Sequence, residues 1–192
     1  FKMIEKQKAK ITFKTNLAVY NLQISRNSNM IYLNKDIELK QNPVGVYQVK
    51  SEIDFKWRLG LLNGFHNLNY NWNSDKSIIR EPSLALYNTC FLEKKIFKKS
   101  LNSKLGIDFT YLYHYESKGY IPSLGLFYLT DGSVVGNYYL LTPFVEAEIK
   151  SVKLRLEAKN LENILLNQDY YVISNYPTSP MFIQFGLSWL LK

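Results

Sequence analysis

The chain has 192 residues, which is enough for one domain but short for two. A hydrophobic fraction of 46% with a charged fraction of 21% is typical of a folded chain and excludes a disordered one. The net charge of +8 would suit a nucleic-acid-binding protein, but the lysines form no dense basic run, so no nucleic-acid partner is expected. No stretch of about 18 apolar residues is present, so a transmembrane helix is excluded and any membrane crossing must use strands.

The first part of the chain contains predicted strands of uneven quality. Apolar and polar residues largely alternate in residues 11–19, which predicts a strand with one apolar side. Residues 29–39 form a second predicted strand with poorer alternation, and residues 47–59 alternate almost without interruption. The apolar side of this third strand carries Tyr47, Val49, Ile53, Phe55, Trp57 and Leu59, and its polar side carries Gln48, Lys50, Glu52, Asp54, Lys56 and Arg58.

The dipeptide Asn63-Gly64 follows this strand and predicts a two-residue hairpin turn, because both of its residue types tolerate a positive φ. A turn there pairs Leu62 with Phe65 and brings like residues together along the hairpin. The predicted apolar pairs are Leu59 with Leu68, Trp57 with Tyr70 and Phe55 with Trp72, and the predicted polar pairs are Arg58 with Asn69 and Lys56 with Asn71.

The middle of the chain contains two further predicted strands and one less regular segment. Residues 84–97 are one predicted strand, and residues 105–115 are another, whose apolar side ends in tyrosines. Residues 120–130 are the candidate for a tenth strand. Counting membrane crossings backwards from the C-terminus places this segment in an excursion outside the membrane instead.

A second hairpin is predicted in residues 145–158, with its turn at Lys150-Ser151. The predicted partners are Ile149 and Val152, Ala147 and Leu154, Val145 and Leu156, Glu148 and Lys153, and Glu146 and Arg155. A helix is the competing interpretation, since four apolar residues between Leu154 and Leu165 would share one helical face. The matched charge pairs favour strands.

The last predicted strand, residues 181–191, has six large apolar residues on one side and mostly small or polar residues on the other. In a soluble sandwich such an apolar side faces a core, and in a membrane barrel it faces lipid. Strand lengths of about 9–11 residues favour the barrel. Polar sides with charges of both signs and apolar sides that end in Tyr or Trp favour it too, and so does the aromatic fraction of 15%.

The predicted connections alternate between short and long, as in bacterial barrels. With the C-terminus on the periplasmic side, the short turns at 63–64, 98–102 and 150–151 are periplasmic, and the longer segments 73–83, 117–143 and 160–180 lie outside. Nine crossings are an odd number, and the chain does not start with Met, so further strands are expected before Phe1. Residues 1–192 are thus interpreted as a single all-β domain, an antiparallel transmembrane β-barrel of about 9–10 strands that is incomplete at its N-terminal end.

The second half of the chain contains a series of short aromatic and glycine-containing stretches. They include Leu105-Gly106-Ile107-Asp108, Gly125-Leu126-Phe127-Tyr128, Gly136-Asn137-Tyr138, residues 144–160, Tyr176-Pro177 and Phe185-Gly186-Leu187-Ser188-Trp189. On these stretches, the region from Leu105 onward resembles the C-terminal region of the putative porin family of the Bacteroidota. The resemblance implies an outer-membrane barrel that acts as a passive channel. The chain departs from the usual barrel ending, an aromatic residue, because it ends in Leu190-Leu191-Lys192.

The polar sides of the clean strands supply the candidate lumen-lining residues. These are Lys50, Glu52, Asp54, Lys56, Arg58, Lys104, Asp108, Glu146, Glu148, Lys153 and Arg155. The candidate interface girdle consists of Tyr47, Trp57, Tyr70, Trp72, Tyr113, Tyr115 and Trp189. No phosphate-binding glycine loop or nucleophile elbow is present, and His66, His114 and Cys90 have no partner at a suitable spacing. No catalytic, cofactor or metal site is therefore expected.

These observations predict a channel in the outer membrane of a Gram-negative bacterium that passes small hydrophilic solutes by diffusion and is not an enzyme. The expected partners are outer-membrane lipid and lipopolysaccharide, the solutes, and other outer-membrane proteins. The candidate lumen cations slightly outnumber the acids, which favours a mild preference for anions. Three alternatives stay open: the barrel of a TonB-dependent receptor, a structural or assembly barrel closed to solute, and a soluble β-domain.

Overall fold

The computed structural model describes residues 1–97, 100–166, 170–174 and 176–190. In this part of the chain, no helix is long and apolar enough to cross a membrane. The elements are β1 (Glu5–Lys14), β2 (Ala18–Ser28), β3 (Met30–Leu33), β4 (Leu39–Asn42), β5 (Val46–Leu59), β6 (Leu62–Asn73), β7 (Leu84–Ile96), β8 (Leu101–Leu112), β9 (Tyr115–Ile121), β10 (Leu126–Val135), β11 (Tyr138–Ile149), β12 (Val152–Lys159), α1 (Glu162–Leu166), β13 (Tyr171–Ile173), β14 (Tyr176–Pro177) and β15 (Phe182–Trp189).

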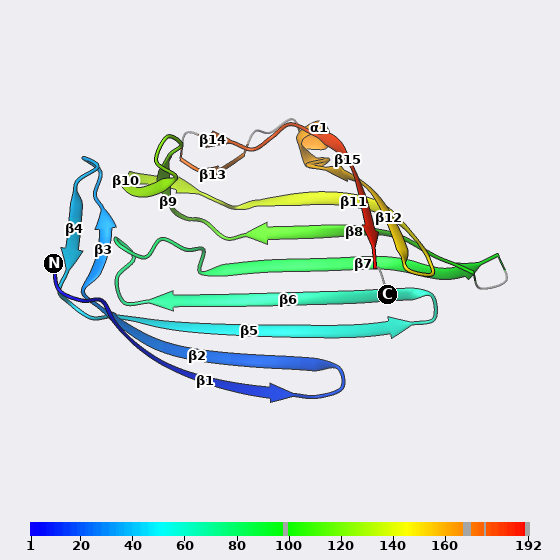
Figure 1. The fold of residues 1–192 in the computed structure, drawn as a ribbon, viewed down its shortest axis with the longest axis horizontal. Coiled ribbons are helices and arrows are strands. Elements are labelled where there is room, and N and C mark those ends of the chain that lie inside the picture. The colour runs from blue at the N-terminus through cyan, green and yellow to red at the C-terminus, as the bar shows by residue number, and fades with distance from the viewer. Residues whose placement is uncertain (98–99, 167–169, 175, 191–192) are drawn as a thin grey trace.

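A nine-stranded sheet with the order β1-β2-β5-β6-β7-β8-β11-β12-β15 dominates the structure. All its neighbouring strands are antiparallel, so the all-β antiparallel prediction is confirmed. Figure 1 shows β1, β2, β5, β6, β7, β8 and β11 lying side by side, with β12 and β15 at a steep angle to them. The sheet is not closed, because β1 and β15 stand at its two ends and do not pair with each other.

Short and long connections alternate along this sheet, as predicted. The connections β1–β2, β5–β6, β7–β8 and β11–β12 are short turns and lie at one edge, here called the short-turn edge. The connections β2–β5, β6–β7, β8–β11 and β12–β15 are longer and lie at the opposite edge, here called the long-loop edge. The second edge carries all the additional elements: β3, β4, β9, β10, β13, β14 and α1.

The hairpin of β11 and β12 has the predicted register in every pair. Ile149 lies opposite Val152, and the two charge pairs, Glu148 with Lys153 and Glu146 with Arg155, are present. Lys150 adopts the positive φ of 54° that this tight turn needs. The competing helical interpretation is wrong for residues 152–159, which are strand, and the helix begins only at Glu162.

The hairpin of β5 and β6 turns at Gly60-Leu61, so the predicted turn at Asn63-Gly64 is wrong. Leu59 pairs with Leu62, and Trp57 lies opposite Gly64 instead of Tyr70. Gly60 has a φ of 62°, which glycine adopts without a steric penalty. The earlier turn lets both strands pair along their whole length, which satisfies more backbone groups. The register moves by an even number of residues, so each side chain keeps its predicted face.

Three predicted strands have different limits in the structure. Residues 11–19 are the tip of the β1–β2 hairpin, where the Thr15 amide donates to the Ala18 carbonyl at 2.8 Å. Residues 29–39 are divided between the short strands β3 and β4. The strand predicted over residues 105–115 ends at Leu112. Turns and chain reversals inside an alternating pattern leave the alternation intact, so the pattern alone does not reveal them.

A second, four-stranded sheet with the order β4-β3-β10-β9 lies at the long-loop edge (Figure 1). It contains the strand residues of the segment 120–130, so this segment is not a tenth strand of the nine-stranded sheet. A small apolar core joins the two sheets. Val46, Ile78 and Ile79 are buried in it, and Met30 and Tyr32 pack against them.

Candidate functional site: the polar face of the sheet and its long-loop cover

The nine-stranded sheet has two chemically different faces. Cross-strand partners share a face, so the register assigns every residue to one of them. We call the face that carries Lys104, Asp108 and Glu146 the polar face, and the opposite one the apolar face. Glu146 is only 6% exposed, whereas the adjacent Val145 is 47% exposed. Side chains converge on the concave face of a curved sheet and spread on the convex face, so this difference indicates that the polar face is concave.

All eleven candidate lumen residues lie on the polar face. In β8, β11 and β12, the cross-strand partners on this face are Lys104 with Glu146, Glu146 with Arg155, and Glu148 with Lys153. In β5 and β6, the partners on the same face include Lys50 with Asn71 and Arg58 with Asn63. The structure brings only some of them into contact. Lys104, Asp108, Glu146, Lys153 and Arg155 meet, whereas Glu52 and Asp54 form a separate group.

The first group, with Glu157 added, forms a charged cluster on β8, β11 and β12. Arg155 is its centre: its guanidinium lies 2.5 Å from Asp108, 2.8 Å from Glu157 and 3.7 Å from Glu146. It also lies over the Phe144 ring, 3.8 Å from the ring centroid. Glu146 bridges to Lys104 at 3.0 Å and to Lys153 at 3.4 Å. Such a matched network keeps the charges on one face and holds neighbouring strands in register.

A second group of polar residues follows β2, β5 and β6. Glu52 accepts hydrogen bonds from Asn21 at 3.3 Å and Asn67 at 3.1 Å, and Asn67 also donates to Asp54 at 2.7 Å. Asn69 continues this chain through its bond to Asn67. These carboxylates are thus held by amides, while the cations beside them on β5, Lys56 and Arg58, are exposed.

The polar face of β1 carries a row of lysines that was missed in the sequence. Lys6, Lys8, Lys10 and Lys14 occupy alternate positions that pair with Asn27, Ser25, Gln23 and Val19 of β2. All four are exposed, and in the described residues none of them forms an ion pair. The first three are about 7 Å apart, as the two-residue repeat of a strand requires, and Thr12 stands between Lys10 and Lys14. The signal was present as the alternation of Lys from residue 6 onward, but the strand was predicted to begin only at residue 11.

Five of the seven candidate girdle residues lie on the apolar face, near its edges. Tyr47, Tyr70 and Trp72 stand toward the long-loop edge, and Trp57 and Trp189 toward the short-turn edge. The other two are elsewhere: Tyr113 follows the end of β8, and Tyr115 opens β9 in the second sheet. Burial raises the pKa of the Tyr115 hydroxyl, which stays protonated and donates to the Val172 carbonyl at 3.0 Å.

One polar chain interrupts the apolar face. The Trp57 indole nitrogen donates to His66 Nε2 at 2.7 Å, and His66 Nδ1 lies 2.7 Å from the Asn88 side-chain oxygen. This arrangement satisfies both ring nitrogens of the histidine without solvent. His114, by contrast, lies beyond β8 and packs against Tyr113, 4.1 Å between ring centroids. Among the described residues, no group of histidines, cysteines and carboxylates could hold a metal ion.

The loop between β6 and β7 lies across the polar face at the long-loop edge. Glu81 of this loop forms an ion pair with Lys50 at 2.8 Å, and the Asn71 and Asn73 side chains donate to the Pro82 and Ile79 carbonyls. The loop covers polar-face residues that would otherwise be open. Val46 and Asn73 are buried there.

Arg80 fastens this loop to the second sheet. Its guanidinium donates to the Ser117 carbonyl at 2.9 Å and to the Thr130 hydroxyl and carbonyl at 2.9 Å and 2.8 Å. Glu116 lies 3.4 Å from it, and the Arg80 side chain is only 7% exposed. Sequence reasoning missed this residue, since it follows no alternation and its partners lie on β9 and β10.

Comparison with solved structures shows the fold. The FrpB iron transporter from Neisseria meningitidis, F5-1 variant in its apoprotein form, matches with a TM-score of 0.62 at 10% identity. The match covers 97% of this chain and 31% of that chain. A chain in the structure of the FpvAI–pyocin S2 complex matches with a TM-score of 0.58 at 13% identity, over 97% of this chain and 27% of that one. The present chain thus spans about a third or less of the proteins that it resembles.

Comparison with curated proteins gives no match. A family comparison matches residues 1–191 to the family described as putative porin. The match covers nearly the whole chain. The resemblance, noted in the sequence only from Leu105 to the C-terminus, therefore includes the N-terminal half as well. With its antiparallel sheet of barrel type, the chain belongs to the putative porin family.

Proposed function

We propose that this chain forms part of the wall of an outer-membrane channel that small hydrophilic solutes cross by diffusion. The apolar face would contact the lipid of the outer membrane, and the polar face would line the lumen. The observation that carries the proposal is the separation of the two chemistries by register in the central strands. Every charged residue of the central cluster lies on one face, and the face behind it is largely apolar, with aromatic residues near both edges.

The lysine row of β1 supports a preference for anions. The charged cluster around Arg155 is internally matched, so its cations and acids largely compensate each other. The lysines of β1 have no such acidic partners in the described part of the chain, and their exposed ammonium groups would attract anions along the lumen. The lysines of β1 would thus determine the ion selectivity, while the charged cluster around Arg155 stabilises the sheet.

Planar-bilayer recordings of the full-length protein test both statements. We expect single-channel conductance, and under a salt gradient a reversal potential on the anion-selective side. The double variant Lys8→Glu/Lys10→Glu should move the reversal potential toward cation selectivity. Lys35→Glu/Lys40→Glu is the matched control, because it makes the same charge change at two exposed lysines of the β3–β4 hairpin. A cation-selective wild type, or equal shifts for both variants, would refute the anion preference.

A barrel closed to solute is the competing proposal, and one observation favours it. The β6–β7 loop and the apolar core around Val46 cover the polar face at the long-loop edge. If these segments fill the lumen of the full-length protein, it would serve as a structural barrel or as a receptor that must be opened by a partner. Absence of conductance from correctly folded protein, with conductance restored by deleting residues 76–81, would support this alternative.

A further inference from the structure

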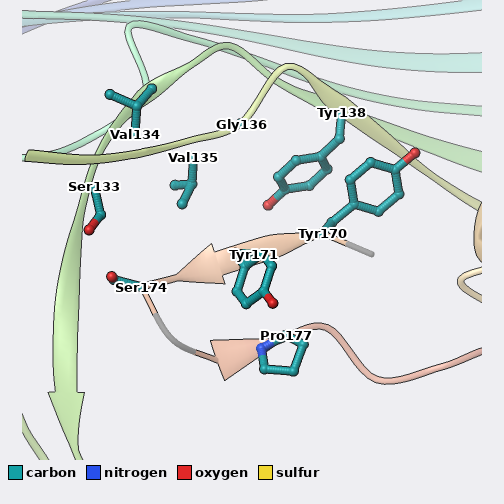
Figure 2. Close-up of a pocket in the computed structure, with 9 residues that line it drawn as sticks. All are labelled: Ser133, Val134, Val135, Gly136, Tyr138, Tyr170, Tyr171, Ser174 and Pro177. Carbon is teal, nitrogen blue, oxygen red and sulfur yellow. The ribbon is translucent and has the colours of Figure 1, made fainter. Parts of the chain in front are cut away.

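A cavity of about 590 Å³ lies at the long-loop edge, between β10, the start of β11 and the β13–β14 hairpin (Figure 2). Its volume is in the range of small-molecule sites, which is about 300–1,000 Å³. Within the described part of the chain, the lining residues are Ser133, Val134, Val135, Gly136, Tyr138, Tyr170, Tyr171, Ser174 and Pro177. None of them is charged, and three are tyrosines.

The walls of this cavity are held by contacts outside it. The Ser174 amide donates to the Ser117 hydroxyl at 2.6 Å, and the Tyr115 hydroxyl donates to the Val172 carbonyl at 3.0 Å, so β13 is tied to β9. The Thr178 amide donates to the Tyr170 carbonyl at 2.7 Å. The rings of Tyr138 and Tyr170 pack 4.8 Å apart. The cavity is therefore built into the fold by several independent interactions.

One polar group in the cavity is buried without a partner among the described residues. Tyr138 is 2% exposed, and no described residue forms a hydrogen bond with its hydroxyl. Figure 2 shows this hydroxyl pointing into the space between Val135, Tyr170 and Tyr171. Buried hydroxyls are nearly always paired in folded proteins, because the loss of hydration is otherwise uncompensated. An unpaired hydroxyl aimed into a preformed cavity is the expected state of a group whose partner is supplied by a ligand.

We infer that this cavity binds a neutral saccharide. A charged ligand would find no countercharge among the lining residues that the structure describes. A sugar ring has an apolar C–H face that can pack on a tyrosine ring and a rim of hydroxyls that can bond to Tyr138, Ser133 and Ser174. This inference adds a solute-recognition site to the proposed channel. It does not require that the lumen conduct.

Isothermal titration of the full-length protein tests the inference. The detergent must have no sugar head group, so lauryldimethylamine oxide replaces alkyl maltosides. The probes are maltose and cellobiose, with glucuronate as the charged probe and a blocked tri-alanine peptide as the neutral non-saccharide probe. We expect saturable binding of at least one disaccharide. Tyr138→Phe should weaken it about tenfold, which is about 1.4 kcal/mol, while Tyr139→Phe, on the opposite face of the same strand, should leave it unchanged.

Several outcomes would overturn the inference. They are binding by no disaccharide, preferential binding of glucuronate or the peptide, and equal affinities for wild type and Tyr138→Phe. A second variant, Tyr171→Ala, removes an exposed ring of the cavity wall and should also weaken binding. Conductance is recorded on the same preparations. A conducting protein without saccharide binding contradicts this inference alone, and a saccharide-binding protein without conductance contradicts only the proposed channel.

Discussion

Replacing Arg155 by Met should destabilise the sheet more than any other single charge removal on the polar face. Arg155 makes two short charge-assisted contacts, with Asp108 at 2.5 Å and with Glu157 at 2.8 Å. Each hydrogen bond to a charged group contributes about 1.5–3 kcal/mol. The Arg155 side chain is 29% exposed, and both carboxylates keep a second partner, Thr89 at 2.7 Å and Lys159 at 3.3 Å.

The exposure of Arg155 and the second partners of the two carboxylates both reduce the expected loss of stability. Solvent screening and the remaining partners lower the contribution of the two contacts to about 2–3 kcal/mol in total. Loss of the guanidinium over the Phe144 ring adds about 0.5–1 kcal/mol, since a Met side chain retains the packing but not the charge. We therefore expect Arg155→Met to lower the free energy of unfolding by about 3 kcal/mol.

The assay is urea unfolding of the full-length protein in lipid vesicles, followed by tryptophan fluorescence and by mobility on gels. Arg155→Lys should lie between wild type and Arg155→Met, because it keeps the charge but loses the planar fork. Lys159→Met is the control: its side chain is 38% exposed and among the described residues it pairs only with Glu157, so its loss should cost less than about 1 kcal/mol. The reasoning would be refuted by a cost under about 1 kcal/mol for Arg155→Met, or by equal costs for Arg155→Met and Lys159→Met.

Three further variants test other parts of the fold. Glu162→Ala removes the carboxylate that accepts the Leu141 amide at 2.7 Å, beyond the last β11–β12 pair, and should cost about 1–3 kcal/mol; unchanged hydrogen exchange at Leu141 would contradict this. Gly64→Ala should displace the Trp57 indole, which lies where the new Cβ would go. Its emission, measured with Trp72 and Trp189 replaced by Phe, should then shift, and an unshifted spectrum would argue against the observed register. Arg80→Met should free the β6–β7 loop from β9 and β10 and increase its proteolysis; equal cleavage rates in wild type and variant would show that Arg80 does not hold the loop.

Much of the sheet could be predicted because its main signal is local. Side chains alternate between faces with a period of two, so Lys104 and Leu105 are assigned to opposite faces by position alone. The register of β11 and β12 was also accessible, since a two-residue turn at Lys150-Ser151 places Glu146 beside Arg155. The turn of β5 and β6 was not, because its position depends on how far the strands can pair with their neighbours, and Gly60 competes with the stronger dipeptide signal at Asn63-Gly64.

The sequence by itself determined the all-β class, the two faces of the strands and the alternation of short turns with long connections. All of these follow from the two-residue repeat and from the positions of turn residues. Only the tertiary structure decided how the long connections fold back. Arg80 reaches Thr130, Glu81 reaches Lys50, and the Tyr138 hydroxyl, beside Tyr170 and Tyr171, has no partner in the described part of the chain. These contacts join segments far apart in the chain and follow no periodic pattern, so the cover over the polar face and its cavity became visible only in three dimensions.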